Sequence, residues 1–320
     1  MTKEQMNKNE RYITLTGGYQ VPLRVDPSAY QYSSVATQQT ADFPASFRLW
    51  TSGIKNQQTK GSCVAHALST LKEIQEHYDT GDNKAFSVGW IYGYRLPTQY
   101  QGEGMYISEA LSNLRHFGAV HKHYIPDNLA YSEITMIIND MKEICLEEAK
   151  NYKIANYAKV NNVTEIKHAI YVDHSPVVVG AMLYDSFYET DGSGIVKSPN
   201  ITKEKNYGGH CMLIIGWTTI NNKEYYVVQN SWGESFGDNG FCYIPINEFF
   251  SFTERWTVLD IQNYNKVFTD IKGRWSENYI NKCVRSGLIS GYEDGTFKPT
   301  NNITREEVCV LFSKLMEKFD

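Results

Sequence analysis

Apolar residues at helical spacing mark the first half of the chain. The first pattern begins just after Cys63, and its apolar face comprises Ala67, Leu68, Leu71, Ile74 and Tyr78. The second ends at Gly118, and its apolar face comprises Ile107, Ala110, Leu111, Leu114 and Phe117. Side chains three and four positions apart lie on one side of a helix, and a glycine after the last of them commonly ends it. The pattern therefore predicts two amphipathic helices.

The second half of the chain carries continuous apolar runs instead. Residues 177–182 read Val-Val-Val-Gly-Ala-Met, and further runs start at Cys211, Tyr225 and Phe241. Short runs rich in β-branched and aromatic residues are typical of buried strands. The sequence therefore predicts an α+β fold in which a helical half precedes a sheet.

Helical spacing returns near Lys266. One predicted helix ends at Gly287, and its apolar face comprises Trp275, Tyr279, Ile280, Cys283 and Val284. Another starts at Thr304 with Glu307 three positions later, which is the spacing of a capping box. Its apolar face comprises Val308, Leu311, Phe312, Leu315 and Met316. So short a segment makes a small core, so we expect it to pack against the rest of the chain or against other copies.

Composition indicates a globular protein. The 320 residues suggest two domains, and 42% hydrophobic residues are enough for substantial cores. The net charge of −5 argues against nucleic acid as a partner. No apolar run is long enough for a transmembrane helix, and residues 1–8 lack the apolar centre of a signal peptide. We therefore expect neither nucleic acid nor membrane as a partner.

Five of the six cysteines predict neither a disulfide framework nor a metal site. They are scattered without CxxC or metal-ligand spacing, at Cys145, Cys211, Cys242, Cys283 and Cys309. Cys283 and Cys309 occupy apolar positions of the C-terminal helical patterns, so we expect them in a core.

Cys63 stands where a reactive thiol can form. It begins the first helical pattern, follows Gly61-Ser62 and lies six positions after Gln57. The partial positive charge at a helix N-terminus favours thiolate over thiol. A glutamine at this distance can direct its side-chain N–H toward an oxyanion near the sulfur. A lone cysteine at a helix start is more often a packed small side chain, so this motif alone does not identify a nucleophile.

Two later motifs supply the groups that a thiol nucleophile requires. His210 follows Gly208-Gly209, and Asn230 begins the sequence Asn-Ser-Trp-Gly. An imidazole can accept the thiol proton, and a third group can orient the imidazole. Each motif alone could be structural, whereas their joint occurrence with Gln57 favours catalysis.

Together these motifs resemble those of papain-family cysteine peptidases. The resemblance implies that Cys63 attacks a peptide carbonyl and that His210 takes the thiol proton and passes it to the leaving amine. Asn230 would hold the imidazole, and Trp232 would shield that bond from water. Gln57 and the backbone N–H of Cys63 would form the oxyanion hole. The alternative is an inactive papain-like scaffold that binds a peptide or a cell wall.

The same resemblance implies a two-lobed fold. A helical lobe would carry the nucleophile, and an antiparallel, barrel-like β-lobe would carry the histidine and asparagine. An extended polypeptide substrate would lie between them, and no cofactor or metal is implied. Two residues depart from the family pattern: Val64 replaces a frequent aromatic residue, and Lys60 replaces a half-cystine, so a disulfide near the site is absent.

By position, the family's pocket for the residue two before the scissile bond would involve Met105, Tyr106, Gly180, Gly208 and Gly209. None of these residues is acidic, so we expect a preference for apolar or aromatic side chains. No added loop with paired histidines is present in the sequence, which favours endopeptidase action.

Residues 1–42 are polar and weakly patterned, and they resemble the short N-terminal extensions of some bacterial members of the family. Pro22 and Pro27 favour an extended path, which a substrate groove accepts. We hypothesise that this arm packs on the peptidase domain, residues 43–263, and restricts access to Cys63, as a short propeptide would. The alternative is a merely structural arm.

Residues 264–320 resemble a single S-layer homology repeat. The matching positions are Gly291-Tyr292, Asp294-Gly295, Phe297, Pro299 and Thr304-Arg305. The resemblance implies binding of an anionic secondary cell-wall polymer, with Arg305 as a contact and with Trp275 and Tyr292 as flat faces for sugars. A cell-wall or extracellular location would follow, but no signal peptide is visible. A cytoplasmic protein, a phage-associated protein or a truncated sequence therefore stay as alternatives. The alternative is a helical cap without a ligand.

Overall fold

The computed structural model describes residues 31–35, 42–95, 103–127, 129–246 and 252–259, and in the C-terminal part 268, 270–271, 273–277, 279–280, 283, 288–289, 291–292 and 295–316. Contacts divide the chain into two compact units, Met1–Val258 and Leu259–Asp320. Each unit is described by itself.

Most of the described helices of unit 1 precede its long strands. They are α2 (Tyr32–Val35), α3 (Cys63–Thr80), α4 (Val88–Gly93), α5 (Ile107–His116), α6 (Tyr131–Asp140), α7 (Lys142–Ala149) with the 3-10 turn η1 (Lys150–Tyr152), α8 (Val163–Tyr171) and α9 (Asp185–Tyr188). The two predicted amphipathic helices correspond to α3 and α5. Gly118 follows α5 with a φ of 84°, and a Cβ there would lie 1.9 Å from the carbonyl oxygen of Ala149. Both observations require glycine at this position.

Strands dominate the second half of unit 1. They are β1 (Phe47–Arg48), β2 (Asn156–Lys159), β3 (Val177–Tyr184), β4 (Asn206–Ile220), β5 (Lys223–Gln229), β6 (Phe241–Pro245) and β7 (Phe252–Leu259). Their order in the sheet is β2-β7-β3-β4-β5-β6, and β1 pairs with β4. The α+β class is confirmed. The described strands form an open path that ends at β2 and β6, so the sheet is not the closed barrel that a barrel-like lobe suggests.

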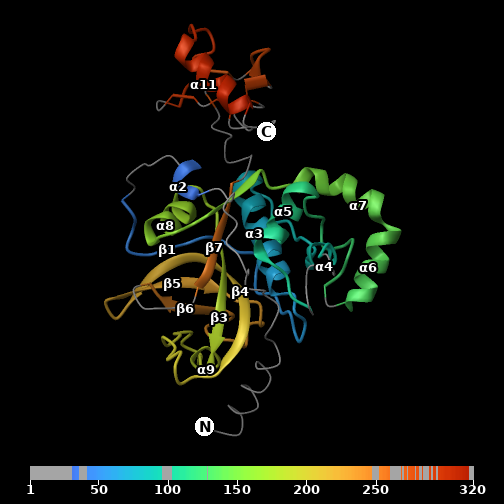
Figure 1. Ribbon diagram of the computed structural model, residues 1–320, viewed down its shortest axis with the longest axis vertical. Coiled ribbons are helices and arrows are strands. Elements are labelled where there is room, and N and C mark those ends of the chain that lie inside the picture. Colours follow the sequence, from blue (N-terminus) through green and yellow to red (C-terminus); the bar gives the residue numbers. More distant parts are fainter. Residues whose placement is uncertain are drawn as a thin grey trace. The chain divides into compact units, whose positions relative to one another are not determined.

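Helix α3 packs against the sheet, and Figure 1 shows it beside β4 with α4 and α5 on its other side. Its residues from Cys63 to Glu76 are all buried, including three charged side chains. One of these, Glu73, accepts hydrogen bonds from Lys55 Nζ at 2.7 Å and from the backbone N–H of Phe86 at 2.9 Å. Because the carboxylate is fully buried, these contacts offset its desolvation. They also fix the segment that precedes α3.

Helix α2 attaches part of the N-terminal region to unit 1, and it lies beside α8 in Figure 1. The buried Tyr32 hydroxyl contacts Nδ1 of His168 at 2.7 Å and donates to the carboxylate of Asp173. Gln31 forms a parallel bridge with Lys159. Residues 1–30 and 36–41 of the expected arm lie outside the described residues.

Unit 2 has a small core of Phe268, Ile271 and Ile280, on which Ile289 and Phe297 pack. Its helix α11 (Arg305–Met316) starts with the predicted capping box. Glu307 N–H donates to Thr304 Oγ1 at 3.1 Å, and Thr304 N–H donates to Glu307 Oε2 at 2.7 Å. No helix in the described part of the chain is long and apolar enough to cross a membrane.

Several apolar residues of unit 2 are not in its core. Trp275 and Tyr279 are 86% and 67% exposed, although they share the predicted helix face with the buried Ile280. Cys309 is exposed and Cys283 only half-buried, so the expectation that both lie in a core is wrong for Cys309. Phe312 and Met316 are also more than half exposed. Periodicity thus identified the helix but not which of its faces is covered.

Candidate active site

Cys63 is the first residue of α3 and is fully buried. Burial raises the pKa of its thiol to about 12, and backbone N–H groups of Cys211, Val64 and Cys63 itself lower it. Because a buried thiolate is strongly disfavoured without a cationic partner, Cys63 needs an adjacent base to ionise.

His210 lies on β4, opposite Ala181 of β3, and Cys211 is the next residue of the same strand. The backbone N–H of Cys211 lowers the pKa of the Cys63 thiol. Helix α3, which Cys63 begins, packs against β4, the strand that carries the imidazole. Burial lowers the pKa of His210 to about 4, while the hydrogen bond to Asn230 raises it and nearby His66 lowers it. The imidazole is therefore neutral until it accepts a proton from a neighbour.

The network around Asn230 determines which imidazole nitrogen carries the proton. Asn230 Oδ1 lies 2.8 Å from His210 Nε2 and accepts the backbone N–H of Ser231 at 2.8 Å. A backbone N–H can only donate, so the shared atom is the amide oxygen and Nε2 must also donate to it. Nδ1 then carries the lone pair, and it has no hydrogen-bond partner among the described residues. The ring is held in the tautomer that can accept a thiol proton.

Trp232 covers this pair. Its ring lies 4.9 Å from that of His210, at an interplanar angle of 37°, and is 1% exposed. Phe187, Tyr188 and Phe236 surround the indole at ring distances between 5.1 and 5.5 Å. This cluster keeps water away from the histidine–asparagine hydrogen bond, which is stronger in a dry environment.

Gln57 is fully buried. It lies far from Trp232 in the sequence, but its side chain joins the same hydrogen-bond network. The Ser231 hydroxyl donates to Gln57 Oε1 at 2.7 Å, and Gln57 Nε2 donates to the carbonyl of Lys60 at 2.9 Å. The backbone N–H of Gln57 donates to the Ser231 carbonyl at 2.8 Å. The amide nitrogen thus faces the turn that leads into Cys63.

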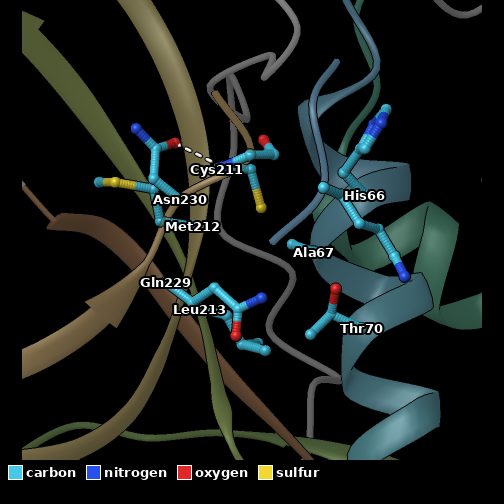
Figure 2. Close-up of a pocket in the computed structure, with 10 residues that line it drawn as sticks. His66, Ala67, Thr70, Cys211, Met212, Leu213, Gln229 and Asn230 are labelled. Carbon is cyan, nitrogen blue, oxygen red and sulfur yellow. Dashed lines mark hydrogen bonds between the residues drawn. The ribbon is translucent and has the colours of Figure 1, made fainter. Parts of the chain in front are cut away.

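A small cavity lies behind these residues, where α3 faces the strands (Figure 2). Its volume is about 10 Å³, room for one water molecule. The residues that line it are Lys55, His66, Ala67, Thr70, Cys211, Met212, Leu213, Gln229, Asn230 and Ser231. Figure 2 shows Cys211 and Leu213 on the strand side and His66, Ala67 and Thr70 on α3. The site is therefore assembled at the contact between the two halves of unit 1.

The five residues expected in the substrate pocket fall into two groups. Gly208, Gly209 and Gly180 lie on β4 and β3, where Gly180 pairs with Cys211. Met105 is buried and Tyr106 precedes α5, on the helical side. Arg305, Trp275 and Tyr292, expected to contact wall polymer, belong to unit 2.

Sequence reasoning missed three acidic side chains near the site. Glu73 holds Lys55, two residues before Gln57. Glu103 Oε2 accepts the backbone N–H of Gly61 at 3.1 Å, and a Cβ at Gly61 would lie 2.7 Å from Cβ of Glu103. Glu254 pairs with Gly180 across β7 and β3. Each depends on a contact between distant segments, and no local motif marks it.

The chain is similar to known cysteine proteases. Residues 40–249 match the family described as papain family cysteine protease. Relatives include a cysteine protease of Blomia tropicalis, 23% identical over 200 residues that cover 60% of this chain and 56% of the relative. Cathepsin S of Rattus norvegicus is 28% identical over 203 residues, which cover 61% of this chain and 57% of the relative. The matched segment spans less than two thirds of the length of these relatives.

Solved structures share the fold. Xylellain, a cysteine protease from Xylella fastidiosa, superposes with a TM-score of 0.64 at 21% identity, covering 77% of this chain and 97% of that one. Procathepsin L2 from the Tenebrio molitor larval midgut superposes with a TM-score of 0.60 at 19% identity, covering 81% of this chain and 80% of that one.

A second family match covers part of unit 2. Residues 267–309 match the S-layer homology domain. Cell surface glycoprotein 1 of Acetivibrio thermocellus is 44% identical over 61 residues, 19% of this chain and 3% of that protein. The S-layer homology match is separate from the longer one over residues 40–249, on which the assignment of the chain rests: this protein belongs to the papain family of cysteine proteases.

Proposed function

We propose that unit 1 is a cysteine endopeptidase in which Cys63, His210 and Asn230 perform the chemistry. The observation that carries the proposal is the double acceptance by Asn230 Oδ1, which leaves the lone pair of His210 on Nδ1. A histidine held in this tautomer can accept the proton of a thiol. The match to the papain family supports the same reaction.

In the proposed reaction, His210 Nδ1 takes the Cys63 proton and the thiolate attacks the peptide carbonyl carbon. The developing oxyanion receives hydrogen bonds from Gln57 Nε2 and the Cys63 backbone N–H. The imidazolium then protonates the leaving amine, and an acyl-enzyme remains on the sulfur. Water, deprotonated by the same imidazole, hydrolyses the thioester and restores the thiol.

Thiol labelling separates this proposal from an inactive scaffold. Iodoacetamide should modify Cys63 with a second-order rate far above that of exposed Cys309, and modification should abolish hydrolysis of a fluorogenic peptide. Peptide mapping by mass spectrometry identifies the labelled site, and the Cys309→Ser variant serves as the matched control. Equal rates at both cysteines with no turnover would identify a binding scaffold.

We also propose that unit 2 binds an anionic cell-wall polymer with low affinity. Arg305 begins α11, and both an arginine fork and a helix N-terminus favour carboxylates. The exposed rings of Trp275 and Tyr279, 6.2 Å apart, could stack on sugars, as could half-exposed Tyr292. Glu306 and Glu307 in the same helical turn oppose an anion, so useful binding would need several copies.

A pull-down with purified cell-wall sacculi tests this role. The intact chain should sediment with the wall, whereas a 1–263 truncation and Arg305→Ala should remain in solution. Lys314→Ala, at the other end of α11, is the charge-matched control. If the truncation sediments as well as the intact chain, unit 2 is not an anchor.

A further inference from the structure

Helix α11 of unit 2 has apolar residues on several sides, yet none of its residues 305–316 is buried. One side of the helix is half-buried and comprises Val308, Leu311 and Leu315. With 3.6 residues per turn, a second row lies about 100° around the helix. This outer row comprises Arg305, Cys309, Phe312 and Met316. Phe312 and Met316 are 56% and 61% exposed, and Cys309 is exposed as well. An exposed apolar row is typical of a surface that a partner covers.

A groove with a volume of about 630 Å³ lies on another side of α11. The helix residues that line it are Glu306, Glu307, Val310, Leu311 and Lys314. Apolar residues of the preceding segment also line it, among them Ile289, Phe297 and Ile303. Glu307, Val310 and Lys314 are each two positions, or about 200°, from a residue of the outer row. The groove and the outer row therefore lie on nearly opposite sides of one helix, and a groove of this size can hold large apolar side chains.

The outer row and the groove are complementary in polarity and in charge. The row is a line of apolar side chains on a helix, and the groove is an apolar depression with carboxylates at one end. Arg305 is at the N-terminal end of the row, and Glu306 and Glu307 are at the N-terminal end of the groove. If the row of one copy enters the groove of another with the helices parallel, Arg305 meets these carboxylates. Antiparallel helices would place Arg305 near Lys314 instead, so charge favours the parallel arrangement.

We propose that unit 2 binds a second copy of this chain, with the outer row of one copy in the groove of the next. Contact between two outer rows would leave both grooves open, whereas this contact covers a row and a groove together. Two copies joined in this way keep one row and one groove free, so assembly continues until a ring closes. The inference does not depend on the proposed wall binding, but such an assembly supplies the several copies that weak polymer binding requires.

Sedimentation velocity of the full chain under reducing conditions tests the proposal. Because the contact is small, we expect association at micromolar concentrations, with species larger than a dimer at about 100 μM. Phe312→Glu in the outer row and Val310→Glu in the groove should each leave the chain monomeric. Both side chains are more than half exposed, so both variants should fold, as circular dichroism can verify. Ser313→Glu adds the same charge to an exposed position of α11 outside both surfaces, and this control should assemble like the parent.

Mixing the two variants distinguishes the proposed contact from a symmetric one. Phe312→Glu retains its groove and Val310→Glu retains its outer row, so the mixture should form a heterodimer and nothing larger. Different fluorescent labels on the two variants identify this species. A Val310→Glu variant that assembles alone, or a mixture that stays monomeric although the parent assembles, would overturn the row-in-groove contact. A parent that stays monomeric at the highest concentration would also overturn the proposal and leave the groove to another ligand, such as the wall polymer.

Discussion

The two units of the chain hold their proposed functional residues in opposite ways. In unit 1 Cys63, His210 and Gln57 are fully buried, and each contacts groups from a distant segment. In unit 2 Trp275 is 86% exposed, and the described buried core residues are Phe268, Ile271 and Ile280. Proton transfer needs atoms fixed to a fraction of an ångström, which a large core can supply. A surface for polymer binding needs exposed rings and charges, which a small core leaves available.

The largest expected effect separates chemistry from folding in unit 1. Cys63→Ala and His210→Ala should each lower kcat by about 10⁴-fold or more, because proton transfer and nucleophilic attack are lost. Asn230→Ala should lower kcat by a smaller factor, because it removes the group that orients the imidazole ring rather than a reacting atom. Stopped-flow or long-incubation peptide assays measure the rates, and circular dichroism checks the fold. Full turnover by a folded Cys63→Ala protein would end the proposed mechanism.

Core substitutions should show that the units fail separately. Glu73→Ala leaves Lys55, 16% exposed, without its buried partner, and should destabilise unit 1 by about 3–5 kcal/mol. Activity should be lost at a lower temperature than in the parent.

Phe268→Ala should destabilise unit 2 by about 3–5 kcal/mol. Because that loss is large for a core of which three buried residues are described, unit 2 should unfold while peptide hydrolysis continues. Calorimetry together with activity against temperature distinguishes the two cases. Simultaneous loss of both units in Phe268→Ala would mean that they are one cooperative body.

A smaller effect should appear in the pH dependence of unit 1. Burial lowers the pKa of His66 to about 4, while its hydrogen bond to Ser62 raises it. The unfolded chain binds this proton near pH 6.5, whereas the folded protein binds it only near pH 4. The neutral His66 side chain therefore makes its full contribution to stability above pH 6.5. As the pH falls toward 4 this contribution is lost, and the free energy of unfolding decreases by about 3 kcal/mol.

Urea unfolding between pH 4.5 and 8 measures this dependence. His66→Gln cannot bind the proton, so its free energy of unfolding should vary less with pH than that of the parent. Burial also lowers the pKa of His210, so His210 should account for part of the pH dependence that remains in the His66→Gln variant. An unchanged slope in His66→Gln would contradict the role of burial at this position.

The smallest expected effect concerns the N-terminal arm, for which we retain the hypothesis that it restricts access to Cys63. Deleting residues 1–30 preserves Tyr32, which is anchored to His168. The deletion should raise the rate of Cys63 alkylation by iodoacetamide severalfold, by about 3- to 10-fold if the arm occupies the groove part of the time. Tyr32→Phe in the full chain is the control for anchoring. An unchanged rate in a folded deletion protein would make the arm structural.

Periodicity and local motifs predicted much of unit 1. The apolar face of residues 67–78 corresponds to α3, and Val177–Met182 lies within β3, because burial of one face or of a whole strand leaves a pattern in nearby residues. The histidine and asparagine motifs were recognisable by their local sequences and their resemblance to a known family, and the structure brings their side chains together.

What the sequence did not predict depends on register and on tertiary packing. Glu254 faces Gly180 only because β7 pairs with β3 in this register, which no local pattern encodes. The exposure of Cys309 shows the same limit, since an apolar spacing cannot say whether a partner covers the helix. The open path of the described sheet likewise follows from strand order rather than from any single strand.

The division of the site between α3 and the later strands has a consequence for biosynthesis. Cys63 is made early, but His210 and Asn230 follow 147 and 167 positions later. In the proposed mechanism, a growing chain that has folded its helices still lacks a base for the thiol, so it could not cleave itself or neighbouring nascent chains. Contacts of such long sequence separation form late in folding. The order of residues along the chain therefore delays proteolytic competence until the sheet that positions the base has formed.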